Sequence, residues 1–142
     1  MSTAREYCQN IGRELEALEL ILSTDIEALR LITTERTAYD NETIEQYDEA
    51  VSELDADIEL DAYQIVSQYL YETVLEITIL RTDDRQQTRV EILRTCGGPR
   101  CDISRDSNDG QIISVTTYDG HDQATIRNSY PELSNYLDEL AQ

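Results

Sequence analysis

The spacing of apolar residues changes near residue 73, and this change divides the chain into two structural halves. Before it, apolar residues recur every three or four positions, as on one face of an α-helix,. After it, Leu75, Ile77 and Ile79 alternate with the residues between them, which is typical of a β-strand,. Helices followed by strands in one chain predict an α+β fold, and 142 residues are enough for a single domain over 1–142,.

The first half, residues 1–72, predicts a coiled-coil-like helical hairpin. One apolar seam comprises Cys8, Ile11, Leu15, Leu18, Leu22, Leu29, Ile32 and Tyr39, and a second comprises Ile44, Tyr47, Val51, Leu54, Ile58, Ala62, Ile65 and Tyr69,. If the first helix is continuous, its apolar seam is exposed to water unless a second copy of the chain covers it. This predicts a homodimer through the hairpin. Alternatively, Ser23-Thr24-Asp25 breaks the helix and the first seam folds back on its own domain.

The second half predicts an antiparallel β-meander over 73–128, of four to five strands, and a helix over 129–142. Asn108-Asp109-Gly110 and Asp119-Gly120 stand between alternating runs, and Asn-Gly or Asp-Gly turns are a strong hairpin signal,. Ser129 and Glu132 form a capping box that is expected to start the last helix,.

The stretch RTCGGPRC predicts a tight turn between two strands. Its turn residues are Gly97, Gly98 and Pro99, and its cysteines are Cys96 and Cys101. A strand rather than a helix follows the glycines, which argues against a phosphate-binding loop. Zinc would need four ligands, and the remaining cysteine and the lone histidine lie far off in the sequence,. A disulfide between the two loop cysteines stays open as an alternative.

The segment 90–103 also resembles a signature of small hypothetical proteins from phages, plasmids and their hosts. In that family, a strand ending in cysteine or threonine is followed by Gly-Gly-Pro and another strand, as in VEILRTCGGPRCDI here. The resemblance covers residues 74–118. It implies a fold and a mobile-element origin, and it implies no chemistry.

The net charge of −19, from 30 acidic and 11 basic residues, indicates adaptation to salt. Every basic residue is arginine, and this composition resembles that of haloarchaeal or haloviral proteins. Salt at ~1 M shortens the screening distance to ~3 Å, so a dense carboxylate surface is tolerated. The same charge also fits a nucleic-acid mimic of the antirestriction type. With no apolar run of ~18 residues and no hydrophobic signal core, we expect a soluble cytoplasmic protein without membrane contact,.

Positive charge is concentrated in residues 81–105. This window holds Arg81, Arg85, Arg89, Arg94, Arg100 and Arg105 against four carboxylates, a net +2, so the rest of the chain carries −21. Strand alternation places Arg81 and Arg94 toward the apolar face, where they would pair with acids of the helical hairpin or line an anion-binding edge. The candidates for binding an anion or a partner are Arg81, Arg89, Arg94, Arg100 and Arg105.

The sequence predicts no enzyme, no cofactor and no metal. His121 is the single histidine, and no nucleophile is marked beside it. Nucleic-acid binding is opposed by the negative field of the chain. The sequence therefore favours a non-enzymatic interaction or regulatory module, with an anion-binding module or a nucleic-acid mimic as the alternative.

Overall fold

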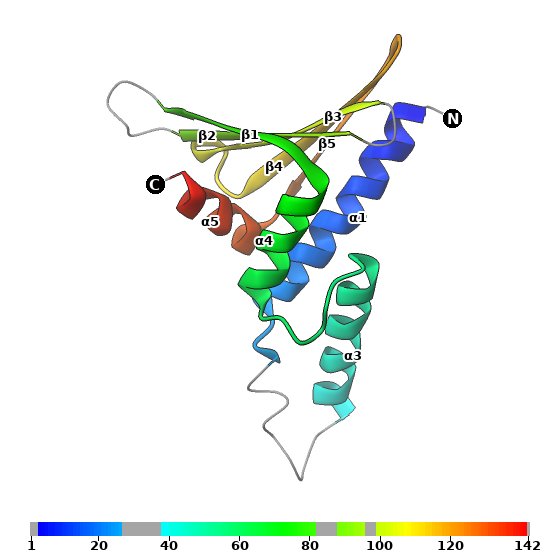
Figure 1. Cartoon of the computed structure of the whole chain (residues 1–142), viewed down its shortest axis with the longest axis vertical. Coiled ribbons are helices and arrows are strands. Elements are labelled where there is room, and N and C mark those ends of the chain that lie inside the picture. Colours follow the sequence, from blue (N-terminus) through cyan, green and yellow to red (C-terminus); the bar gives the residue numbers. More distant parts are fainter. Residues whose placement is uncertain (1–2, 27–37, 82–87, 96–98, 142) are drawn as a thin grey trace.

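The computed structural model describes residues 3–26, 38–81, 88–95 and 99–141, and its arrangement is shown in Figure 1. The helices are α1 (Thr3–Ser23), α3 (Ala38–Glu53), α4 (Ala62–Thr73) and α5 (Pro131–Leu140). The strands are β1 (Val74–Arg81), β2 (Thr88–Thr95), β3 (Arg100–Asp106), β4 (Ile112–Asp119) and β5 (Asp122–Ser129). The predicted α+β class is confirmed. No helix in these ranges has the combined length and apolar character needed to cross a membrane.

The five strands form one antiparallel sheet in chain order, β1-β2-β3-β4-β5, as the predicted meander requires. Two turns depend on glycine because their backbone is left-handed. Gly110 has a φ of 65° after the short 3-10 helix Ser107–Asp109, and Gly120 has a φ of 62° between β4 and β5,. The alternation of the strands then gives the sheet two distinct faces.

One face of the sheet is covered by α1, α4 and α5, while α3 lies farther from the sheet (Figure 1). The main core is formed between this face and the helices, from Cys8, Ile11, Leu15, Leu18, Val66, Tyr69, Leu70, Val90, Ile92, Cys101, Ile103, Ile113, Val115, Tyr130, Leu133, Tyr136, Leu137 and Ala141. A second cluster joins α1 to α3 and α4 and comprises Ala17, Ile21, Tyr47, Ala50, Val51 and Ile65. The part of the first predicted seam from Cys8 to Leu18 is therefore buried against the chain's own sheet, whereas Leu29 and Ile32 of that seam lie outside the described residues.

The predicted first helix is not continuous, because α1 ends at Ser23. The hydroxyls of Ser23 and Thr24 donate to the Leu20 carbonyl, at 3.1 and 2.8 Å. They thereby satisfy a carbonyl of the last turn, where the helix itself supplies no amide donor. The break at Ser23-Thr24-Asp25 is thus the alternative that the structure adopts. Since Leu15 and Leu18 lie in the main core, the argument for a second copy covering this seam no longer holds.

The second predicted seam is also broken, between α3 and α4. Asp55 has a φ of 52°, its amide donates to the Ser52 carbonyl at 3.0 Å, and the Ala56 amide donates to the Val51 carbonyl at 3.0 Å. These features make a Schellman motif, which ends a helix. Helix α4 then begins with a capping box between Asp61 and Gln64,. Aspartate occupies the position where glycine is usual, so neither glycine nor proline marks this helix end in the sequence.

The last helix begins at Pro131, one residue later than a Ser129 cap would start it, and its N-cap residue Tyr130 makes no side-chain capping hydrogen bond. The carboxylate of Glu19 in α1 instead accepts from the amides of Glu132 and Leu133, at 3.1 and 3.0 Å. The Ser129–Glu132 capping box is therefore wrong. A carboxylate from a distant helix replaces it, because the exposed amides of a helix N-terminus favour any nearby anion.

Candidate functional site

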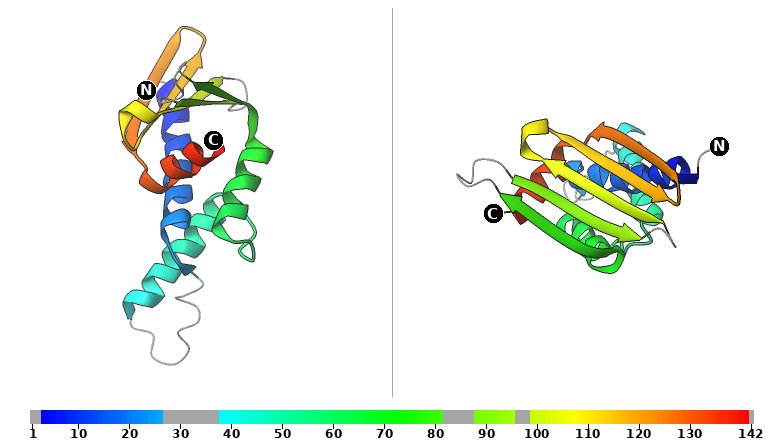
Figure 2. Two further views of the ribbon diagram at one scale, coloured as in Figure 1. Left: turned by 90° about the vertical axis from the view of Figure 1, so that its left-hand side faces the viewer. Right: turned by 90° about the horizontal axis from the view of Figure 1, so that it is seen from above.

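The second face of the sheet carries no helix and is the candidate functional site. Seen from above in Figure 2, the five strands lie in front and the helices lie behind them. Residues such as Val90, Ile103 and Val115 point to the covered face and are buried, so their strand neighbours point outward,. We call this outward side, from β1 to β5, the open face.

The strand register arranges the open face in rows that run across the sheet. One row contains Thr78, Glu91, Ser104, Ser114 and Arg127, and the next contains Glu76, Leu93, Asp102, Thr116 and Thr125. Arg100 stands opposite Tyr118 in a third row. Most of these side chains are hydroxyls or charged groups in close cross-strand contact, which makes the face polar but not uniformly acidic.

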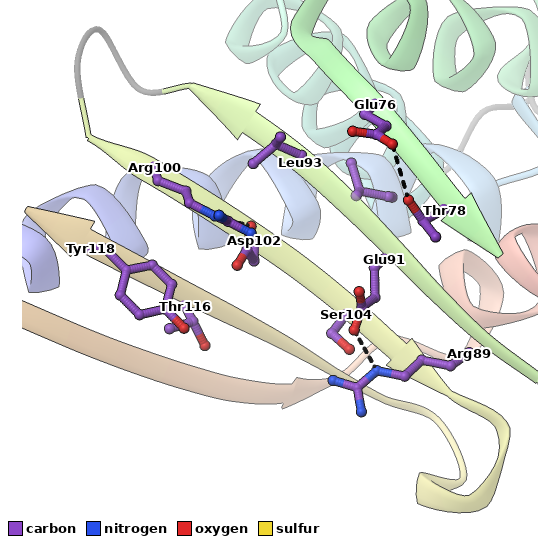
Figure 3. Close-up of a pocket in the computed structure, with 11 residues that line it drawn as sticks. Glu76, Thr78, Arg89, Glu91, Leu93, Arg100, Asp102, Ser104, Thr116 and Tyr118 are labelled. Atoms are coloured by element: carbon purple, nitrogen blue, oxygen red, sulfur yellow. Dashed lines mark hydrogen bonds and ion pairs between the residues drawn. The ribbon is translucent and has the colours of Figure 1, made fainter. Parts of the chain in front are cut away.

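A shallow hollow of about 380 Å³ lies across β1 to β4 on the open face (Figure 3). Its lining comprises Glu76, Thr78, Arg89, Glu91, Ile92, Leu93, Arg100, Asp102, Ser104, Thr116 and Tyr118. Tyr118 and Thr116 lie along one strand of the hollow, and Arg89 lies at the opposite end (Figure 3). The hollow therefore offers hydrogen-bonding groups, one aromatic ring and two aliphatic residues, Ile92 and Leu93.

The guanidinium groups on the open face are held by neighbouring carboxylates. Arg89 Nε lies 2.8 Å from Glu91, and Arg100 Nε lies 3.2 Å from Asp102. The carboxylate of Asp102 raises the pKa of the Arg100 guanidinium, chiefly by accepting its hydrogen bond. These arginines thus form surface ion pairs with carboxylates of their own strands.

The charge balance of the open face differs from that of the rest of the chain. Its charged residues are Arg89, Arg100 and Arg127, and Glu76, Glu91, Asp102 and Asp106. Three arginines against four carboxylates give −1, so the remainder of the chain carries −18 of the total −19. The open face is nearly neutral on an otherwise strongly acidic protein.

The structure separates the five candidate arginines into two groups. Arg89 and Arg100 lie on the open face, whereas Arg81, Arg94 and Arg105 turn to the covered face and contact helices. Arg94 pairs with Glu14 of α1, so of the two expected roles it has the pairing with a helical acid and not the lining of an anion-binding edge. Arg81 differs from that expectation, because it donates to the Ala141 carbonyl at the end of α5.

Arg105 is buried beside the same helix. Its Nη2 lies 3.0 Å from Asp138, and its Nη1 donates to the Asp106 carbonyl. The five arginines therefore do not converge on one site, because strand alternation and helix packing send them to opposite faces of the sheet.

The loop of the RTCGGPRC stretch lies largely outside the described residues, which exclude Cys96, Gly97 and Gly98. Thr95 pairs with Arg100 across β2 and β3, so the connection joins two antiparallel strands, and Pro99 lies in a bend. Cys101 is buried and disulfide-bonded, while Cys8 is a free buried thiol. Cys96, the other member of the disulfide that the sequence leaves open, lies outside the described residues.

Within the described ranges, no three His, Cys, Asp or Glu side chains are placed to hold a metal ion. His121 is exposed in the turn between β4 and β5 and does not line the hollow. The hydroxyls of Thr78, Ser104 and Thr116 line the hollow instead, and none of the three belongs to a candidate site predicted from the sequence. Strand alternation was the available signal for two of them, because Ser104 follows the buried Ile103 and Thr116 follows the buried Val115,.

No protein-family model matches this chain, and neither the curated proteins nor the solved structures compared with it include a match.

Proposed function

We propose that this chain is a non-enzymatic protein–protein interaction or regulatory module of a haloarchaeal or haloviral cytoplasm, and that the open face binds its protein partner. The observation that carries the proposal is the charge balance of the face, −1 on a chain of −19. Hydrated carboxylates keep a salt-adapted surface wet, whereas the centre of a protein interface is depleted of charged residues. A nearly neutral face therefore repels an approaching protein less than the strongly acidic remainder of the chain does.

The side chains of the hollow suit a protein ligand. Tyrosine and arginine are enriched at protein interfaces, and Tyr118 stands beside Arg100 across β3 and β4,. The hydroxyls of Ser104 and Thr116 add donors and acceptors that do not carry charge. The carboxylates paired to Arg89 and Arg100 also make anion binding the weaker alternative, because Glu91 and Asp102 already offset the charge of these guanidinium groups.

Site-specific photo-crosslinking tests the proposal. p-Benzoyl-phenylalanine is placed at Thr116 in the hollow or, as a control, at the exposed Glu45 of α3, and each protein is irradiated in host lysate at 2–3 M KCl. A single protein adduct is expected from position 116 alone. An excess of wild-type protein without the photo-crosslinker should reduce the yield of this adduct. An excess of the Thr116→Arg variant should leave the yield unchanged. Equal adducts from both positions, or no adduct from position 116, would contradict the proposal.

A further inference from the structure

Three small side chains meet inside the core between α1 and the sheet, and two of them carry sulfur. Cys8 of α1, Cys101 of β3 and Thr117 of β4 are each 0 % exposed. Cys101 stands opposite Thr117 in the antiparallel pairing of β3 and β4. We call these three residues the sulfur cluster. It lies on the covered face and contributes nothing to the lining of the hollow.

A single hydroxyl oxygen lies between the two sulfur atoms of the cluster. The Cys8 thiol donates to Oγ1 of Thr117 at 3.1 Å, and the Thr117 hydroxyl donates to Sγ of Cys101 at 3.7 Å. The separation of the two sulfurs therefore cannot exceed these two distances together. The carbonyls of Ala124 and Val115 are alternative acceptors for Cys8, at 3.2 and 3.6 Å, but a thiol has one proton and uses one acceptor at a time.

The two sulfurs of the cluster are in different oxidation states. Cys101 is disulfide-bonded, whereas Cys8 is a free thiol. A thiol and a disulfide are the reactants of thiol–disulfide exchange, in which a thiolate attacks one disulfide sulfur and the other sulfur leaves. Because Cys101 is fully buried, thiols in solution do not reach its sulfur in the folded protein. Cys8 is already held beside it, and fixed proximity accelerates such a step.

We propose that Cys101 exchanges its disulfide partner for Cys8, with Thr117 as the residue that positions both sulfurs. The Cys8 thiolate attacks Sγ of Cys101, and a Cys8–Cys101 bond forms. The former partner of Cys101 leaves as a thiolate and takes up the proton that Cys8 lost. One disulfide breaks and one forms, so the step consumes no oxidant or reductant. The cluster is then a redox site with two bonded states, one of which joins α1 covalently to β3.

The sulfur cluster lies directly behind one end of the hollow. Arg100 precedes Cys101 in β3, and Tyr118 follows Thr117 in β4. Both neighbours line the hollow on the other side of the sheet. A covalent change at Cys101 therefore occurs one residue away from the open face, although the exchange itself does not depend on what that face binds.

Disulfide mapping of the full chain tests the exchange. Wild type is incubated in 2–3 M KCl at about pH 8.5, close to the ordinary pKa of a cysteine thiol, with no redox reagent added. Acid then stops the reaction, because exchange needs the thiolate, and pepsin digestion with mass spectrometry identifies joined peptides. A peptide pair joined through Cys8 and Cys101 is expected. Cys96→Ser oxidised with glutathione disulfide gives the same pair as a standard, since only these two cysteines remain.

A shifted thiol is the matched control. The double variant Cys8→Ser with Ala4→Cys moves the thiol by one turn of α1, about 5.4 Å, along the same buried side of the helix. It should give no peptide pair joined to Cys101. A wild type without the joined pair would overturn the proposal. Equal yields from the wild type and the shifted thiol would also overturn it, because the place of Cys8 in the fold would then not matter.

Thr117→Val and Thr117→Ser test the positioning role of the hydroxyl. Valine matches threonine in shape without the hydroxyl, and serine keeps it. The joined pair should form at least tenfold more slowly in Thr117→Val and at a rate close to that of wild type in Thr117→Ser. Circular dichroism checks that both variants are folded. Equal rates in the two variants would overturn the role of Thr117, and faster exchange in guanidinium chloride than in the folded protein would assign the reaction to the unfolded chain and overturn the proposal.

Discussion

At Arg94, a guanidinium on the covered face of the sheet meets polar groups from two helices. It donates to both carboxylate oxygens of Glu14 in α1 and to the hydroxyl of Tyr69 in α4. The Tyr69 hydroxyl donates to the same carboxylate at 2.9 Å, and the guanidinium carbon lies 5.5 Å from the Tyr69 ring centroid. Since a buried charge is tolerated only with such partners, this triad holds α1, α4 and β2 in one arrangement.

The triad predicts a specific loss of stability at alkaline pH. Burial, helped by the charge and hydrogen bond of Glu14 and opposed by Arg94, raises the pKa of Tyr69 well above its usual value of about 10,. The folded state therefore keeps a proton that the unfolded state releases. The stability from this proton is complete below about pH 10 and declines as the pH rises further.

Tyr69→Phe should reduce this decline, although it should lower stability at pH 7 by about 1 kcal/mol through the lost hydrogen bond. Urea unfolding at pH 8 to 11 in 2 M KCl measures the slope for both proteins. A pH titration followed by absorbance at 295 nm should show one fewer tyrosine that ionises at high pH in the variant. The signal of the buried Tyr130, whose pKa is raised as well, should be present in both proteins. Identical slopes in wild type and variant would show that Tyr69 does not retain its proton.

Among the elements, the turn from α3 to α4 shows how a helix can stop without glycine or proline. Asp55 adopts the left-handed backbone at the end of α3, and Ala56 packs back on the cluster that contains Val51. Leu54 then contacts both cores, which sets α3 against α1 and leaves α4 free to cover the sheet. The turn through residues 54–61 thus separates α3, which packs on α1, from α4, which packs on the sheet.

Asp55→Gly is expected to raise the free energy of unfolding by about 1 kcal/mol, because glycine adopts positive φ without steric cost. Asp55→Val should lower it by a similar or larger amount, since β-branched residues are rare there. Asp55→Asn is the matched control, because it removes the same charge and still tolerates the left-handed region. Urea unfolding in 2 M KCl measures all three. If Asp55→Asn raised the free energy of unfolding as much as Asp55→Gly, the stabilisation would come from the removed charge and not from relief of the backbone conformation.

For the whole molecule, the distribution of charge matters more than any single ion pair. The open face carries −1, and the remaining −18 lies over the helices, turns and covered side. On α3, Glu45, Glu49 and Glu53 are exposed and follow one another at four-residue spacing. Like charges at this spacing destabilise a helix. Repulsion of this kind extends over ~10 Å at 0.1 M salt and over ~3 Å at 1 M.

The protein should therefore melt at a higher temperature in 3 M than in 0.1 M KCl. Replacing Glu45, Glu49 and Glu53 with glutamine changes the net charge from −19 to −16 and should raise the melting temperature most at 0.1 M. Thermal circular dichroism across the salt series measures both effects, and sucrose of equal osmolality controls for solute exclusion. A wild-type melting temperature that is constant from 0.1 to 3 M would contradict salt adaptation.

Local patterns determined most helices and strands of this protein, because helix and strand periods and turn glycines act over a few residues, although the end of α3 at Asp55 carried no such signal. The change of period after residue 73 predicted the α+β order, and Gly110 and Gly120 marked two of the turns. The acidic composition was likewise a property of the sequence alone. Arg94 could be assigned to the covered face by strand alternation before its partner was known.

Only the tertiary structure decided which surfaces are covered, because that depends on residues far apart in the chain. Glu14 and Arg94 are 80 positions apart, and Glu19 meets the amide of Leu133 across 114 positions. No local pattern specifies such pairs. The same holds for the open face and for the edge of β1: a period of two shows that a strand has two faces, but the packing of the helices decides which face, and which edge, stays exposed.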